Sequence, residues 1–240
     1  MSVQADLSEL VERLQAAAGD NLVSLVLYGS AARGDFHERY SDLNLLLVLA
    51  SARGDALDRL APALHWWSVK KHHRPPLIFT EEELRASTDV FPIELLDIQL
   101  SNRLLAGRDV VSAIAVPMEL HRVQLEHDLR AVLLQLRQHY LIARDDHQQL
   151  QDAIAKSSST VLTLFRHALV AMGLEAPESR REVADRIAQL ESLDARPLHA
   201  ALDLREGRRI ETGIDTLYRL YLDAVAALVH HVDGLAPRQP

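Results

Sequence analysis

The sequence predicts an α/β domain over residues 1–115, followed by an all-α helical bundle over residues 116–240. Helical and strand-like patterns alternate in the first half, which is typical of a sheet covered by helices. After about residue 116, apolar residues recur only at helical spacing and no strand-like segment remains. With 48% hydrophobic and 25% charged residues, the 240-residue chain has enough apolar material to bury such a core.

The first half contains the predicted strands. Apolar spacing predicts helices over residues 7–18 and 55–67, and Thr80 followed by Glu83 has the form of a capping box that starts a short helix. Short apolar runs that end at glycine or polar residues predict buried strands. These strands cover residues 22–28, 42–49, 76–79, 91–99 and 103–106.

The second half contains amphipathic helices. The run Ser157-Ser-Ser-Thr160 lies on one of them, without a base at nucleophile spacing, so we expect it to pack against a neighbouring helix. Three apolar stripes define the helices: Leu125, Leu129, Val132, Leu133, Leu136 and Tyr140; Ile154, Val161, Leu164, Phe165, Leu169 and Met172; and Ile214, Leu217, Tyr221, Val225 and Leu228.

Composition excludes several classes of function. The net charge of −8, from 26 basic and 34 acidic residues, argues against polynucleotide binding, which needs a strong basic face. The absence of cysteine excludes disulfides and thiolate metal sites. Neither a membrane span nor a signal peptide is visible, so we expect a cytoplasmic protein. The one dense basic cluster, Lys70-Lys71-His72-His73-Arg74, is suited to steering a triphosphate.

A phosphate-holding turn is predicted after the strand that ends at Tyr28. Gly29 permits a sharp turn, and the backbone N–H groups of the next residues then point outward at an incipient helix N-terminus. Ser30 adds a hydroxyl donor, and Arg33 adds a fixed positive charge one turn later. A Gly-Ser pair alone is a common turn, so the prediction depends on ligands elsewhere in the chain.

Two oxygen ligands come after a spacer of polar residues. Asp42 begins the next apolar strand and Asn44 lies two residues on, so both side chains leave the same face of a strand. Oxygen ligands at this spacing, beside a phosphate-holding turn, suit Mg²⁺ that bridges a nucleoside triphosphate (NTP).

The stretch Leu27-Tyr-Gly-Ser-Ala-Ala-Arg-Gly-Asp-Phe-His-Glu-Arg-Tyr-Ser-Asp-Leu-Asn-Leu-Leu-Leu-Val48 resembles the signature of the DNA polymerase β-like nucleotidyltransferase superfamily. That signature is a hydrophobic strand, Gly-Ser, a spacer and Asp-x-Asp at the start of the next strand. The resemblance implies a nucleotidyltransferase-type α/β (α+β) domain with a mixed sheet, and a layout like the small bacterial nucleotidyltransferases with a C-terminal helical domain. It also implies two divalent cations and transfer of a nucleoside monophosphate with release of pyrophosphate.

The chain departs from that signature at Asn44, where the family has its second Asp. An amide oxygen still ligates Mg²⁺, but one negative charge is lost, so a weaker or single metal site is expected. Two hypotheses remain open. Either the chain transfers a nucleoside monophosphate to a small-molecule or protein acceptor, or it is a weakened or inactive nucleotide sensor or partner-binding protein.

The resemblance also implies a third carboxylate on a later strand. Glu94 and Asp97 are the candidates; on a regular strand they face opposite ways, and we prefer Glu94 because it lies nearer the start of the predicted strand. For the general base that activates the acceptor hydroxyl, the candidate is Glu126, at the beginning of a long helix of the second domain. The helical domain is also the expected surface of a homodimer.

Overall fold

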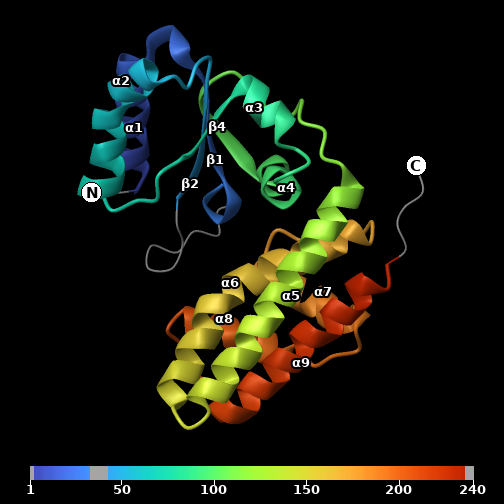
Figure 1. Cartoon of the computed structure of the whole chain (residues 1–240). Helices are drawn as coiled ribbons and strands as arrows, with labels where there is room; N and C mark the ends of the chain where they lie inside the picture. Colours follow the sequence, from blue (N-terminus) through green and yellow to red (C-terminus); the bar gives the residue numbers. More distant parts are fainter. Residues whose placement is uncertain (1–2, 33–42, 236–240) are drawn as a thin grey trace. The chain divides into compact units, whose positions relative to one another are not determined.

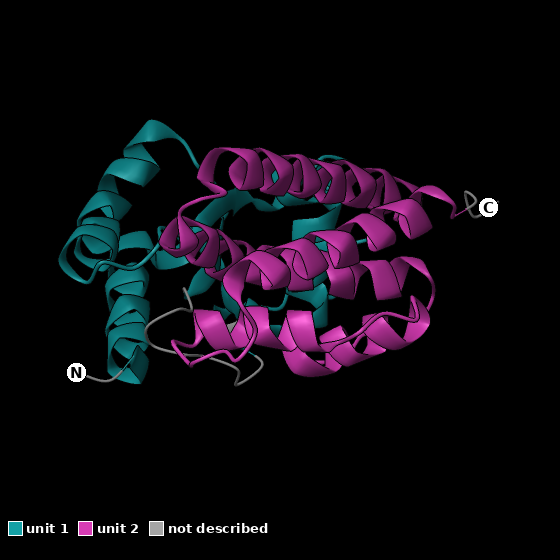
Figure 2. Cartoon of the chain, turned by 90° about the horizontal axis from the view of Figure 1, so that it is seen from below, with its two compact units in different colours: residues 1–117 teal, residues 118–240 magenta. Residues whose placement is uncertain are grey.

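The computed structural model describes residues 3–32 and 43–235. The chain divides into two compact units, residues 1–117 and residues 118–240 (Figure 2). Unit 1 is an α/β domain with a mixed four-stranded sheet, and unit 2 consists of helices, so the predicted fold class is confirmed.

The sheet of unit 1 has the strand order β3-β2-β1-β4. The central strand β1 (Leu22–Tyr28) pairs antiparallel with β2 (Asn44–Leu49) and with β4 (Asn102–Gly107). The strand β3 (Leu77–Thr80) pairs with β2 in parallel. Four of the predicted strands are therefore present, within a few residues of the expected ends.

Each face of this sheet buries one set of alternating side chains, because successive residues of a strand point to opposite faces. One face packs against α1 (Val3–Ala18) and α2 (Gly54–His65) through leucines such as Leu25, Leu27 and Leu47. The other packs Val26 and Leu46 against α3 (Glu81–Ala86) and α4 (Pro92–Leu100) (Figure 1). The sheet is thus covered on both faces.

Two local predictions had opposite outcomes. The capping box is confirmed: the Thr80 amide donates to Glu83 Oε2 at 2.7 Å, and the Glu83 amide donates to Thr80 Oγ1 at 3.2 Å. The predicted strand over residues 91–99 is wrong, because Pro92 begins the helix α4 there. A short buried apolar run fits either structure, and proline at the first helical position favours the helix.

Unit 2 contains α5 (Met118–Ala143), α6 (His147–Ala171), α7 (Arg180–Leu190), α8 (Arg196–Arg205) and α9 (Ile214–Asp233). Most of the predicted apolar stripes lie in its interior, including Leu129, Phe165 and Tyr221. None of the helices in the described part of the chain combines the length and apolar character that crossing a membrane requires.

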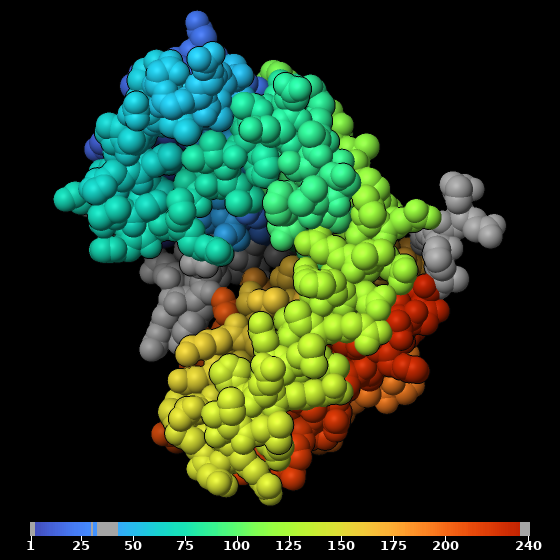
Figure 3. Space-filling view, viewed as in Figure 1, coloured from blue at the N-terminus to red at the C-terminus, as the bar shows by residue number. Residues whose placement is uncertain are grey.

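The helix α5, whose part of the chain is yellow-green in Figure 3, carries several exposed apolar side chains. Val123 and Leu134 are each 55% exposed, Leu141 is 78% exposed and Ile142 is 83% exposed. Single exposed apolar residues are ordinary on a protein surface, but on α5 several lie on one helix.

A buried histidine pair links α5 to α6. His121 and His167 are both fully buried, and His121 Nε2 lies 3.0 Å from His167 Nδ1. A hydrogen bond between two imidazoles needs one nitrogen as donor and one as acceptor, which two neutral rings satisfy. Burial lowers the pKa of His121 to about 4, so His121 is neutral at physiological pH.

This pair makes unit 2 sensitive to acid. The pKa of histidine in an unfolded chain is about 6.5, so the unfolded state binds more protons between pH 6.5 and 4. Above about pH 6.5 protonation of His121 does not reduce the free energy of unfolding. As the pH falls toward 4, the free energy of unfolding decreases by up to about 3 kcal/mol. We expect His121→Gln to flatten the pH dependence of the urea unfolding midpoint in this range. The control His127→Gln, at an exposed position of α5, should leave the wild-type pH dependence, and equal pH slopes for wild type and His121→Gln would contradict the assignment.

Candidate functional site at one end of the sheet

The predicted phosphate-holding turn lies where β1 ends. Gly29 has φ +75°, a left-handed conformation that glycine adopts without strain, and Gly29–Ala31 form a single 3₁₀ turn. The Gly29 amide donates to the carbonyl oxygen of Ser101 at 3.0 Å. The Ser30 amide follows directly in this turn, at the position predicted to face a phosphate oxygen.

Strand register brings further polar side chains to the same end of the sheet. Tyr28, the last residue of β1, pairs with Asn44 on β2 and with Asn102 on β4. Asn44 therefore stands directly beside the turn. Asn102 is tied back to α4, because its Nδ2 donates to the carbonyl oxygen of Gln99 at 3.2 Å.

Asn44 and Asp97 converge on Gly29. A Cβ atom at Gly29 would lie 3.2 Å from Asn44 Nδ2 and 3.9 Å from Asp97 Oδ2. Only a residue without a side chain leaves this space between the amide and the carboxylate. Which atom of the Asn44 amide faces Gly29 is set by its hydrogen bonding, so its oxygen is equally a candidate metal ligand.

Because residues 92–100 form the helix α4 and not a strand, the geometry that distinguishes Glu94 from Asp97 is different from that expected. On a helix, Glu94 and Asp97 are three residues apart and share a face, so the preference for Glu94 from strand geometry has no basis. Glu94 is exposed, whereas Asp97 is partly buried and reaches Gly29. The later strands of the described chain carry no carboxylate, since β3 is Leu-Ile-Phe-Thr and β4 is Asn-Arg-Leu-Leu-Ala-Gly.

The electrostatics around Tyr28 show which charges surround the site. Burial raises the pKa of Tyr28 to about 12; Arg74 acts in the opposite direction, and Asp97 and Glu94 add to the rise. The phenol therefore stays neutral at physiological pH. Sequence reasoning did not identify Tyr28 as part of the site, although it immediately precedes the Gly-Ser pair.

The basic cluster divides into structural residues and one site residue. Lys71 Nζ lies 2.6 Å from Asp6 Oδ1 on α1, and His73 Nε2 lies 3.5 Å from Asp6 Oδ2. Arg74 is three residues before Leu77, which pairs with Leu46, so the parallel strands place it near the end of the sheet where Asn44 lies. Arg74 is therefore the member of the cluster that brings positive charge to the site.

Two predicted site residues, Arg33 and Asp42, lie outside the described residues, and the side chain of Ser30 is likewise not described. Within residues 3–32 and 43–235, no three His, Asp or Glu side chains are grouped to hold a metal ion. Asn44 and Asp97 are the described polar side chains beside Gly29. These are oxygen donors, the ligand type that Mg²⁺ prefers.

Glu126, the candidate general base, belongs to α5 in unit 2. Its carboxylate lies 3.4 Å from Arg122 Nη1 and 2.9 Å from Arg130 Nε, one helical turn on either side. Arg130 continues the network to Asp233 on α9, at 2.9 Å. In this structure the Glu126 carboxylate pairs with two arginines of its own helix, and Arg130 makes the link to α9.

The fold resembles that of a solved structure of spectinomycin adenyltransferase AAD(9) from Enterococcus faecialis, with ATP and spectinomycin. The TM-score is 0.58 at 14% sequence identity, and the match covers 94% of this chain and 100% of that chain. No family model matches the chain, and no curated protein matches it. The likeness therefore establishes a shared fold that extends through both units.

The space at Gly29 leads to a prediction. In Gly29→Ala the methyl group meets Asn44 at 3.2 Å and the backbone is strained, so the free energy of unfolding should fall by about 2 kcal/mol. Gly19→Ala is the matched control, because Gly19 also has a positive φ (+52°) but no atom lies within 4 Å of its Cβ position. Urea denaturation of both variants separates crowding from backbone strain, and equal losses would show that the site is not crowded.

Proposed function

We propose that this protein is a nucleotidyltransferase that binds a magnesium–NTP complex at the end of the sheet beside Gly29. The observation that carries the proposal is the convergence of Asn44 and Asp97 on Gly29. An amide and a carboxylate beside a turn suited to phosphate support this proposal, as does the resemblance of the sequence there to the polymerase β-like superfamily. The shared fold with a protein named as an adenyltransferase supports the same reaction class.

Each residue of the site has a distinct proposed part. Asp42, Asn44 and Asp97 would hold Mg²⁺, with Glu94 as the alternative acid from α4. When bound, Mg²⁺ neutralises charge on the triphosphate. The Ser30 amide and hydroxyl and the Arg33 guanidinium would bind phosphate oxygens.

Arg74 adds positive charge that balances the negative charge on the departing pyrophosphate. Phosphoryl-type transfer depends mainly on positioning and charge neutralisation, which these groups supply. The products would be pyrophosphate and an acceptor that carries a nucleoside monophosphate. The acceptor is a hydroxyl of an unidentified small molecule or protein, and Glu126 remains the proposed base for its proton.

A second function is favoured by the neutral Asn44 and by the absence of acids on β3 and β4 of the described chain. With fewer carboxylates at the site, the protein would bind the nucleotide without efficient turnover, as a sensor or partner-binding protein. The exposed apolar surface of α5 supports a homodimer through the helical unit in either case.

The choice of acid on α4 is tested by matched variants. We expect Asp97→Asn to weaken magnesium–ATP affinity about tenfold, a loss of about 1.4 kcal/mol. Glu94→Gln should change it less than about threefold, because Glu94 is exposed and one helical turn away. Calorimetric titration with ATP, CTP, GTP and UTP, with and without Mg²⁺, makes the measurement. A larger effect of Glu94→Gln would transfer the role to Glu94, and no effect of either variant would remove α4 from the site.

The identity of residue 44 separates the two functions. Asn44→Asp restores a carboxylate beside Asp97, so Mg²⁺ affinity should rise about tenfold in the presence of ATP. Asn102→Asp is the control, because Asn102 also pairs with Tyr28 but on the opposite side. Pyrophosphate release by wild type would establish transfer, and release only by Asn44→Asp would establish the sensor. Weaker magnesium–ATP binding by Asn44→Asp would contradict the proposed ligand role.

A further inference from the structure

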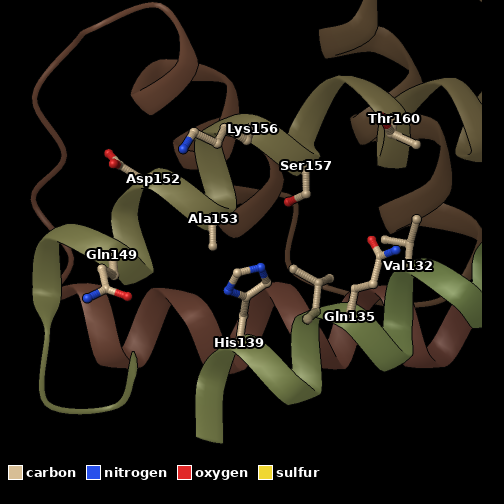
Figure 4. A pocket seen from close by; sticks show the side chains of 10 residues that line it. Val132, Gln135, His139, Gln149, Asp152, Ala153, Lys156, Ser157 and Thr160 are labelled. Carbon is tan, nitrogen blue, oxygen red and sulfur yellow. The ribbon is translucent and has the colours of Figure 1, made fainter. Parts of the chain in front are cut away.

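A groove of about 430 Å³ lies between α5 and α6 in unit 2 (Figure 4). Its volume falls in the range of small-molecule sites. From α5 it is lined by Val132, Gln135 and His139, and from α6 by residues of the stretch 149–160. All of its walls belong to unit 2, so it is separate from the site beside Gly29.

The groove exists because α6 presents small side chains to α5. Ala153, Ser157 and Thr160 are four and three residues apart, so they occupy one face of the helix. Residues of this size leave space that leucine at the same positions would fill. The sequence predicts that residues 157–160 pack against a neighbouring helix. Ser158 is buried in this way, whereas Ser157 and Thr160 line the groove.

The floor of the groove is fixed by hydrogen bonds from α9. Ser157 Oγ lies 3.2 Å from the hydroxyl of Tyr221, which is fully buried. The hydroxyl of Tyr218, also fully buried, donates to the carbonyl oxygen of Leu136 at 2.9 Å. These contacts hold α5 and α6 against α9.

Two nitrogen-bearing side chains at the groove are free to bind a ligand. Lys156 and His139 make no hydrogen bond or ion pair with other described residues. In Figure 4 the His139 ring points into the groove toward Ala153. Asp152, the acid at the same rim, accepts a hydrogen bond from Gln148 Nε2 at 2.9 Å. In a protein with net charge −8, a lysine without an acidic partner over a partly apolar hollow attracts an anion.

We propose that this groove binds a small organic monoanion, a carboxylate with an apolar body. The carboxylate pairs with Lys156 and accepts a hydrogen bond from His139. The apolar body packs on Val132, Leu136 and Ala153. Asp152 at the rim repels a multiply charged anion, which makes inorganic phosphate a poorer ligand than a carboxylate.

Benzoate is the probe, with benzamide as its neutral counterpart and inorganic phosphate as the anion without an apolar body. Titration of the full-length ¹⁵N-labelled protein at constant ionic strength, monitored by amide chemical shifts, locates binding. We expect saturable benzoate shifts over residues 132–139 and 149–160, with benzamide and phosphate each binding at least about fivefold more weakly. Equal binding of phosphate and benzoate would overturn the apolar part of the proposal, and equal binding of benzamide would overturn the charge part.

Two variants test the groove directly. Lys156→Gln should weaken benzoate binding at least about fivefold, whereas Arg137→Gln, which removes a charge of α5 outside the groove lining, should not change it. Ala153→Leu fills the hollow and should abolish the shifts while the circular dichroism spectrum is kept. Benzoate binding that survives Lys156→Gln, or an absence of saturable shifts in wild type, overturns the proposal even if Ala153→Leu fails to fold.

Discussion

The central strand β1 is enclosed on all sides, and this enclosure determines where chemistry can occur in unit 1. It pairs with β2 along one edge and with β4 along the other, while helices cover both faces of the sheet. Leu25, Val26 and Leu27 are at most 1% exposed, so a polar side chain at any of these positions would be buried without water. The polar side chains of the candidate site gather where β1 ends. The left-handed turn at Gly29 ends the strand and leaves room for them.

This end of the sheet carries one negative charge fewer than the Asp-x-Asp pattern would give it, because residue 44 is Asn. A carboxylate at position 44 would face the Asp97 carboxylate across Gly29, and two such charges repel strongly unless a cation lies between them. The neutral Asn44 removes that repulsion, so the electrostatic cost to the metal-free protein is smaller. A neutral amide also attracts cations less strongly than a carboxylate at this position would. Asp97, supplied from α4 rather than from a strand, keeps one carboxylate within reach of the turn.

Sequence patterns over a few residues correctly predicted those structural features that depend on residues close together in the chain. The strands that become β1 to β4, the Thr80 capping box and the tight turn at Gly29 arise from apolar runs and residue type over a few positions. The prediction was wrong for the segment that forms α4. A run of nine mostly apolar residues is compatible with a buried helix as well as with a buried strand. Arg74 reaches the site only through the parallel pairing of β2 with β3, a register that no local pattern specifies. Arg33 and Asp42 are known from the sequence alone.

In unit 2, polar groups in the interior form hydrogen bonds between helices. His121 meets His167, Ser157 meets Tyr221, and the hydroxyl of Tyr218 meets a carbonyl oxygen of α5. Apolar contacts alone tolerate a helix that slides along its neighbour, because leucines at successive turns are interchangeable. A buried hydrogen bond does not tolerate it, since a shift of one turn leaves a donor or acceptor unpaired at a cost of about 1–3 kcal/mol. Three such bonds therefore fix the register of α5, α6 and α9. A bundle held in one register can keep an unfilled groove between two of its helices, where an all-leucine bundle would close it.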